Sequence, residues 1–334
     1  MIIYGSDKLF KDKLSELAIK SSWYSSLYTE SSLKYYQQRP KDEGKKLQDK
    51  SFILEWEREP VAAFIGGIVE FGGINSLVAY EVPCIMVECK EGITGKAIKV
   101  FIHEFYKILS EINGEVRIRD YLIGGEISPL SSYIMLKGAN ALPNFIRVID
   151  LTKDAVQLKS QVRKSYGSLI NWGLRELEPQ IIDKNKIKWG HFLQFRELHI
   201  RESGRETRSI KTWRRQYDSV LNGEGFLVFG HLENKLISAG YFSVSQTNCC
   251  YGVSASRRDL FHKPLFHSLM WKSMLYAKEI GCRWFEVGEQ HFLNHPTGHH
   301  VTKKEQGISD FKAGFGGKTR LFLDLNLSIK ESIL

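Results

Sequence analysis

Two carboxylates at the end of an apolar strand are the first candidates for chemistry. The segment RWFEVGEQ, residues 283–290, is typical of a strand, and Glu286 and Glu289 fall at its end. A carboxylate beside a cleft is a credible general base for an amine. We therefore expect one of the two to accept a proton from a substrate, and the sequence leaves open which one.

A lysine in a glycine-rich stretch is the second candidate. The segment QGISDFKAGFGG, residues 306–317, places Phe311 and Phe315 four residues apart, so both are expected to face the core. Lys312 then points away from them and could donate to the oxyanion of an acyl-transfer reaction. The glycines that follow, beginning at Gly314, permit close backbone approach and offer N–H groups for the same purpose.

A basic segment with interleaved aromatic and amide side chains is the third candidate. Apolar spacing predicts one helix over residues 152–177, beginning at Thr152 as N-cap. Its cations suit phosphate groups, which arginine and lysine bind through charge-assisted hydrogen bonds. The alternative is a solvated basic face. The candidate ligand-binding residues are Arg163, Lys164, Tyr166, Asn171 and Trp172.

Two further polar stretches carry weaker signals. Four histidines, His291, His295, His299 and His300, lie close together, but their spacing does not match a zinc motif, so we expect no metal site. The arginine-rich segment 199–217 could contact nucleic acid. Acidic residues lie among its arginines, which favours an ordinary charged surface.

The elements around these candidates form a repeat. Residues 51–71 and 225–245 each predict a strand, a tight turn and an apolar strand containing glycine. Residues 95–114 and 263–282 each predict an amphipathic helix that ends at glycine and leads into another strand. This repetition indicates duplication of an α+β domain. We place the two domains at residues 1–150 and 151–334, and expect a long loop at residues 37–50.

Composition limits the classes of protein that are possible. The 334 residues carry a formal net charge of +9, which favours anionic partners without identifying them. The five cysteines are odd in number and lack zinc-type pairing, which indicates reduced thiols. No apolar run is long enough to span a membrane and no signal peptide is evident, so we expect a cytoplasmic protein without an integral membrane segment.

The motifs, taken in order, resemble a known family. VRKSYGSLINWG, HSLMWKSMLYAKEIGCRWFEVGEQ and ISDFKAGFGG are similar to landmarks of the FemAB-like branch of the GNAT acyltransferase superfamily, which is typified by peptidoglycan bridge aminoacyltransferases. The resemblance covers mostly residues 155–322. It implies an α+β fold of tandem GNAT-like domains, each a mixed, mostly antiparallel sheet flanked by helices.

The resemblance also implies an activity. We expect an N-acyl or N-aminoacyltransferase that moves an acyl group from an aminoacyl-tRNA or an acyl thioester, such as acyl-CoA, to an amine. The acceptor would be an amino sugar or sugar nucleotide of surface-polysaccharide biosynthesis. No tightly bound cofactor is implied, tRNA is a possible partner, and the oligomeric state stays open. Further substrate contacts are expected at Tyr251, His267, Gln290, Lys304 and Phe315.

One departure from the pattern of the family keeps alternatives open. The loop SRRDLFHKPLFHS, residues 256–268, lacks the QxxGxG/A pattern with which GNAT enzymes hold the pyrophosphate of coenzyme A. Its Arg257, Arg258 and Lys263 could still meet an anion. The alternative function is a non-catalytic GNAT-like protein that binds nucleic acid or carbohydrate.

Overall fold

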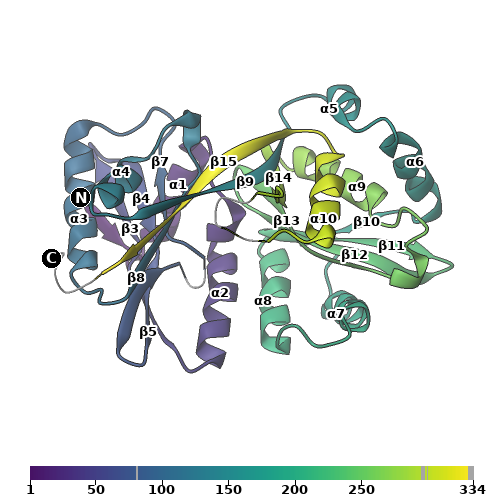
Figure 1. Cartoon of the computed structure of the whole chain (residues 1–334), viewed down its shortest axis with the longest axis horizontal. Coiled ribbons are helices and arrows are strands. Elements are labelled where there is room, and N and C mark those ends of the chain that lie inside the picture. Colours follow the sequence, from purple (N-terminus) through teal and green to yellow (C-terminus); the bar gives the residue numbers. More distant parts are fainter. Residues whose placement is uncertain (80–81, 295–297, 299, 330–334) are drawn as a thin grey trace.

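Two lobes joined by long strands make up the molecule (Figure 1). The computed structural model describes residues 1–79, 82–294, 298 and 300–329. No described helix has both the length and the apolar character needed to cross a bilayer.

The first half of the chain, up to residue 150, supplies most of the N-terminal lobe. Its elements are β1 (Ile2–Tyr4), α1 (Phe10–Lys20), η1 (Ser26–Tyr28), α2 (Glu30–Asp42), β2 (Lys46–Asp49), β3 (Phe52–Trp56), β4 (Glu59–Ile65), β5 (Gly67–Phe71), β6 (Ile74–Val78), β7 (Ile85–Glu88), α3 (Gly95–Leu109), β8 (Glu115–Asp120), η2 (Ile123–Gly125), α4 (Pro129–Leu136) and β9 (Asn140–Asp150).

The C-terminal lobe follows. Its elements are α5 (Ala155–Gln161), α6 (Tyr166–Glu176), β10 (Gln180–Ile182), α7 (Trp189–Ser203), α8 (Ile210–Leu221), β11 (Gly225–Leu232), β12 (Lys235–Val244), β13 (Asn248–Ser256), η3 (Arg258–Leu260), α9 (His267–Glu279), β14 (Trp284–Glu289), α10 (Lys303–Ala313) and β15 (Lys318–Ser328).

The predicted repeat is present as an order of elements. In the N-terminal lobe the hairpins are followed by α3 and then by β8, which runs parallel to β6. In the C-terminal lobe the β11–β12 hairpin is followed by β13, α9 and β14, and β14 runs parallel to β13. The other strand pairs in both lobes are antiparallel within the described residues. The prediction of an α+β fold with tandem, mostly antiparallel units is therefore confirmed.

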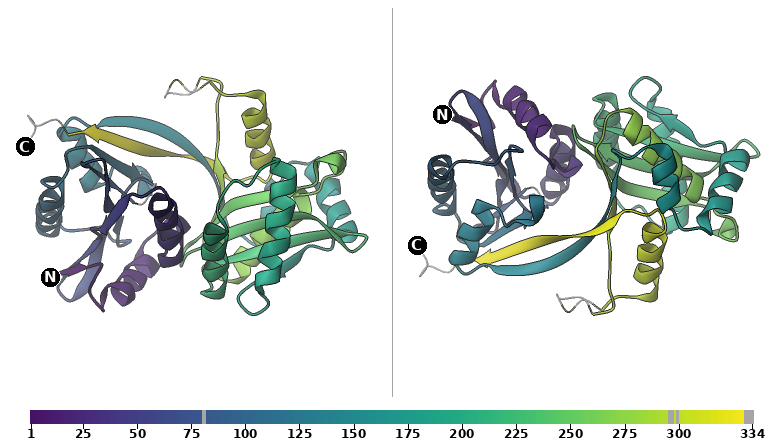
Figure 2. Two further views of the ribbon diagram at one scale, coloured as in Figure 1. Left: turned by 90° about the horizontal axis from the view of Figure 1, so that it is seen from below. Right: turned by 90° about the horizontal axis from the view of Figure 1, so that it is seen from above.

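The sheets are less separate than the sequence predicts. One small sheet has the order β1-β3-β4-β7, and the large sheet has the order β10-β11-β12-β13-β14-β9-β15-β8-β6-β5-β2 within the described residues. The final strand β15 pairs with β9 along most of its length and with β8 at its end. Figure 2 shows β9 and β15 as an arched ribbon between the lobes. The domain boundary at residue 150 stays a prediction.

The strand predicted over the apolar part of residues 51–71 changes sheets at Gly66. It divides there into β4 of the small sheet and β5 of the large sheet. A Cβ at Gly66 would lie 2.4 Å from Sγ of Cys84 and 2.7 Å from the ring of Phe64. The backbone therefore passes so close to the core that only glycine fits.

Two local predictions are wrong. Residues 37–50 are not a long loop, because α2 extends to Asp42 and β2 follows; α2 packs against α8 of the other lobe. The helix predicted over residues 152–177 is broken between α5 and α6, where the backbone N–H of Arg163 donates to the carbonyl of Gly314 at 2.8 Å. The N-cap of α5 is Asp154, which forms a capping box with Gln157.

Candidate active site

The point at which β13 and β14 part defines the candidate site. These strands pair only from Asn248 opposite Trp284 to Cys250 opposite Glu286 within the described residues, and β14 then continues along β9 alone. The helix α9 connects them and begins at His267. In open sheets with such strand–helix–strand units, ligands bind beyond the carboxyl ends of the strands, where neighbouring connections part.

Glu286 lies at the point where the two strands part, and it is only 2% exposed. The Nδ2 of Asn248 donates to its Oε1 at 2.8 Å. Burial raises the pKa of Glu286 to about 7, although the Asn248 amide and the charge of Arg119 favour the ionised form. The fold therefore favours the protonated form of this carboxyl group more than water does.

Lys312 reaches the same face of β14 from the last turn of α10. Its Nζ donates to the backbone carbonyl of Glu289 at 3.2 Å. Burial lowers the pKa of Lys312, and the charge of Glu289 opposes this shift. The ammonium group is therefore partly desolvated, and its remaining N–H groups can donate hydrogen bonds to a substrate oxygen.

A bulge in β14 provides the space for Lys312. The register with β9 shifts between Glu286 and Gly288, and Gly288 has a φ of 110°. A Cβ at this position would lie 2.8 Å from Nζ of Lys312. Only glycine readily adopts this φ and leaves room for the amine, so the strand sequence EVGE already specifies where the lysine fits.

The predicted catalytic residues are brought together around Cys250, which the sequence alone predicts only to be a reduced thiol. Cys250 pairs with Glu286 across the ladder. Burial raises the pKa of its thiol, and the charges of Glu286, Lys312 and Glu289 all act on it. The alternation of Cys249 and Cys250 along β13, with one side chain on each face, is the sequence signal that could have placed Cys250 here.

Four rings from three segments of the chain gather around the end of α10. The ring of His267 lies 4.5 Å from that of Tyr166 and 5.1 Å from that of Phe311, and the rings of Phe311 and Phe315 lie 5.1 Å apart. Burial lowers the pKa of His267 to about 4, so this histidine is neutral at pH 7. Phe315 has no exposed surface, so the prediction that it touches substrate is corrected: it belongs to the core.

Arg163 and Gln290 lie near these groups but are largely engaged with the chain. The guanidinium of Arg163 lies 5.2 Å from the centre of the Tyr166 ring and donates to the carbonyl of Asp310 at 3.2 Å. Gln290 is buried, and its Nε2 lies 3.4 Å from the carbonyl of Glu289. The N–H of Gly314 donates to the carbonyls of Asp310 and Phe311, so it is not free to bind an oxyanion.

The other predicted substrate-binding residues do not contact the groups around Lys312 in the interactions described. Lys164, just before α6, and Asn171, on α6, are exposed, and Lys304 is exposed in the first turn of α10. Trp172 instead has the ammonium of Lys263 over its ring at 5.7 Å. The hydroxyl of Tyr251 forms a hydrogen bond with that of Ser254, and its ring packs against the ring of Phe266.

The histidine-rich segment shows no metal arrangement among the described residues. The backbone N–H of His291 donates to the hydroxyl of Ser309 at 3.0 Å. His295 and His299 lie outside the described residues, and His300 is exposed.

The order of hairpin, helix and parallel strand, present in both lobes, defines a tandem GNAT-like fold. The chain is similar in structure to FemX, with a TM-score of 0.73 at 11% identity over 97% of this chain and 96% of that chain. It is also similar to L-PGS from Bacillus licheniformis, with a TM-score of 0.57 at 11% identity over 94% of this chain and 90% of that chain. A tandem GNAT protein of the clavulanic acid biosynthesis pathway is similar with a TM-score of 0.53 at 11% identity over 99% of this chain and 98% of that chain. No protein-family model and no curated protein sequence matches the chain.

Proposed function

We propose that this protein is an N-acyltransferase or N-aminoacyltransferase that uses the end of β14 as its reaction centre. The observation that carries the proposal is the half-buried ammonium of Lys312, held over Gly288 beside the diverging ends of β13 and β14. The fold shared with FemX and a tandem GNAT protein supports the same class of reaction.

The reaction requires few groups. The nitrogen of an acceptor amine attacks the carbonyl carbon of the donor, and a tetrahedral oxyanion forms. Lys312 has three N–H donors, one of which bonds the carbonyl of Glu289, so the others can stabilise that oxyanion. The C–O or C–S bond of the donor then breaks, and the leaving oxygen or sulfur takes up a proton.

The proton of the amine needs an acceptor, and we assign this role to Glu289. This residue is exposed at the end of β14, whereas Glu286 is closed to solvent. Glu286 then serves as a positioning group that holds Asn248 beneath the site. Neither step requires a covalent enzyme intermediate.

The donor and acceptor follow from the resemblance noted above. We propose an aminoacyl-tRNA or an acyl thioester as donor, and an amino sugar or sugar nucleotide of surface-polysaccharide biosynthesis as acceptor. Exposed Arg163 and Lys164 are the candidate phosphate contacts for either substrate. Assays with aminoacyl-tRNA and acyl-CoA donors, against a panel of amino sugars, distinguish these donors directly.

The test of the reaction centre is the variant Lys312→Ala. Loss of an oxyanion donor lowers kcat by roughly 100- to 1,000-fold while the fold is retained, as judged by circular dichroism. The control is Lys303→Ala, which removes an exposed lysine of the same helix. Full activity of Lys312→Ala would place the reaction centre elsewhere.

The variant Glu289→Gln tests the proton acceptor. We expect kcat to fall by roughly 100-fold or more, because an amide cannot accept the proton. An unchanged kcat would show that water or the substrate itself takes the proton.

A further inference from the structure

A cavity lies at the contact between the two lobes, away from the candidate active site. It has a volume of about 300 Å³ and is lined mainly by α1, the segment leading into α2 and the strand ends of the N-terminal lobe. Only Glu224 and Gln246 come from the C-terminal lobe. None of the residues expected at the active site line this cavity, which is large enough for a small organic molecule.

The inner walls of the cavity are apolar. Tyr24 and Tyr28 are buried, and each donates its hydroxyl hydrogen to a backbone carbonyl. Tyr24 donates to the carbonyl of Tyr28, and Tyr28 donates to the carbonyl of Pro83, each at 2.6 Å. Their rings therefore face the cavity as apolar surface. Aliphatic and aromatic side chains complete the walls: Phe10, Leu14, Leu33 and Ile65.

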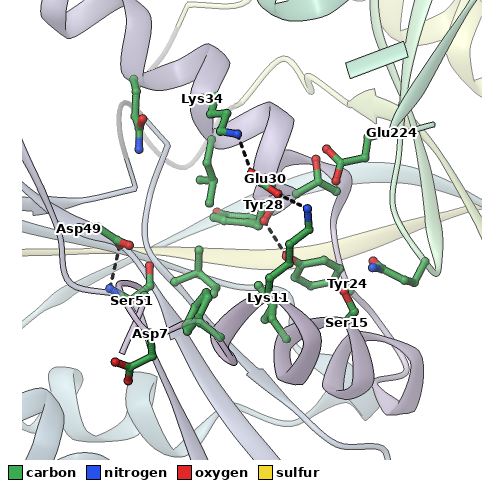
Figure 3. A pocket seen from close by; sticks show the side chains of 18 residues that line it. Asp7, Lys11, Ser15, Tyr24, Tyr28, Glu30, Lys34, Asp49, Ser51 and Glu224 are labelled. Carbon is green, nitrogen blue, oxygen red and sulfur yellow. Dashed lines mark hydrogen bonds and ion pairs between the residues drawn. The ribbon is translucent and has the colours of Figure 1, made fainter. Parts of the chain in front are cut away.

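The lysines at the rim are already neutralised. Glu30 lies 2.8 Å from Nζ of Lys11 and 2.5 Å from Nζ of Lys34, so one carboxylate binds both ammonium groups. Figure 3 shows this Lys11–Glu30–Lys34 group, together with Glu224, on one side of the cavity and Asp7 and Asp49 on the other. The charge of Glu224 also acts on Lys11, so two carboxylates balance the two ammonium groups and the lysines are poorly placed to attract an anion.

The other carboxylates of the rim form no close ion pair with a cation among the described residues. Each accepts a backbone N–H: Asp7 from Tyr4 at 2.7 Å, Asp49 from Ser51 at 3.0 Å and Glu224 from Ser31 at 2.8 Å. The lining thus contains four carboxylates and only two ammonium groups. The excess negative charge lies on the side formed by Asp7 and Asp49, directly beside the apolar walls (Figure 3).

We propose that this cavity is a binding site for a small organic amine with an apolar stem. The ammonium group of the ligand bonds Asp49 and Asp7, and its stem lies along Phe10, Leu14 and Leu33. The ammonium group of the ligand compensates the excess negative charge of the rim, and its stem buries apolar surface.

Hydrogen bonds connect a wall of this cavity to the candidate active site. Tyr24 lines the cavity, and its backbone N–H donates to the hydroxyl of Thr247 at 2.9 Å. Thr247 donates to Asn248 at 2.6 Å, and Asn248 donates to Glu286. A buried chain of hydrogen bonds therefore runs from the wall of the cavity to the base of the candidate active site. The proposal itself concerns binding and does not depend on acyl transfer.

Three matched probes test the charge requirement. Hexylamine, hexanol and hexanoate have the same stem and differ in the charge of the end group. Isothermal titration and thermal-shift measurements at pH 7 should show saturable binding of hexylamine, with at least tenfold weaker binding of hexanol and hexanoate. Equal binding of hexanol and hexylamine, preference for hexanoate, or no saturable binding of hexylamine at millimolar concentration would overturn the proposal.

Two variants locate the bound amine. Asp49→Asn and Asp7→Asn each keep a side-chain oxygen for the backbone N–H but remove the negative charge, and each should weaken hexylamine binding about tenfold. The matched control is Asp12→Asn, an exposed position of α1 that does not line the cavity. If both cavity variants bind hexylamine as tightly as the control does, the amine is bound elsewhere and the proposal fails. Having two variants guards against misfolding of either one.

Discussion

Glu286 shows how one buried carboxyl group makes stability depend on pH. Its pKa is raised from 4.5 to about 7 by burial, so the folded protein binds more protons than the unfolded chain between these values. The contribution of Glu286 to stability is therefore most favourable below pH 4.5, declines as the pH rises to 7, and is constant above it. A shift of this size corresponds to about 3 kcal/mol.

The variant Glu286→Gln tests this relation. It keeps an acceptor for Asn248 but cannot ionise, so it should be more stable than the parent protein at pH 8, by up to about 3 kcal/mol. At pH 4.5 the two proteins should differ little. Urea unfolding at both pH values measures the difference, and Glu176→Gln, at an exposed position, is the control. Parallel stability profiles for Glu286→Gln and the parent would contradict the raised pKa.

Alanine substitutions at Gly288 and Gly281 separate the effect of backbone strain from the effect of displacing the Lys312 side chain. Both have positive φ, 110° and 93°, so alanine at either position strains the backbone by about 1–2 kcal/mol or more. A Cβ at Gly281 meets nothing within 4 Å, whereas at Gly288 it would displace Lys312. We expect both variants to lose stability in thermal melts, but only Gly288→Ala to lose activity as well. Comparable activity in the two variants would show that the position of Lys312 does not matter.

At the scale of elements, the end of α10 is fixed by contacts with a distant segment. Gly314 has an ordinary helical φ of −64°, so alanine there would normally be neutral or mildly stabilising. A Cβ would, however, lie 2.3 Å from the ring of Tyr166. Overpacking at this contact should cost about 1–3 kcal/mol.

A double-mutant cycle isolates this contact. Gly314→Ala should be destabilising in the parent protein and much less so, or even stabilising, when Tyr166 is already alanine. Chemical unfolding of the four proteins gives the coupling energy. Additive effects would mean that the ring of Tyr166 does not oppose the new methyl group.

The same elements mark what the sequence could and could not predict. Local apolar spacing was enough to predict α3, α9 and the hairpins, because each has an apolar face of its own. It could not predict the break before Tyr166, which depends on the carbonyl of Gly314, about 150 residues away. Likewise, polar α2 is held by α8 of the other lobe. At the candidate site, residue types were enough to propose Glu286 and Lys312, but the contact between Gly288 and Lys312 depends on the geometry of the bulge.

At the scale of the whole molecule, β15 unites the lobes. It lies between β9 and β8 in the large sheet, and Leu325 and Leu327 of this strand are buried in the core of the N-terminal lobe. The guanidinium of Arg119 on β8 also bonds both carboxylate oxygens of Asp324, at 2.7 and 2.9 Å. The N-terminal lobe is therefore completed by a strand that follows it by more than 160 residues.

This arrangement predicts that a fragment of residues 1–150 is not stable alone. Without β15 it lacks part of its core and leaves the edges of β8 and β9 unpaired, which favours aggregation. Fusion of residues 318–328 to this fragment through a flexible linker should restore a cooperative thermal transition in circular dichroism, because the missing strand is returned. A matched fusion carrying L325D and L327D should not, since two buried apolar side chains become charged. Cooperative unfolding of the unfused fragment would show instead that the N-terminal lobe folds without the strand that joins it to the rest of the molecule.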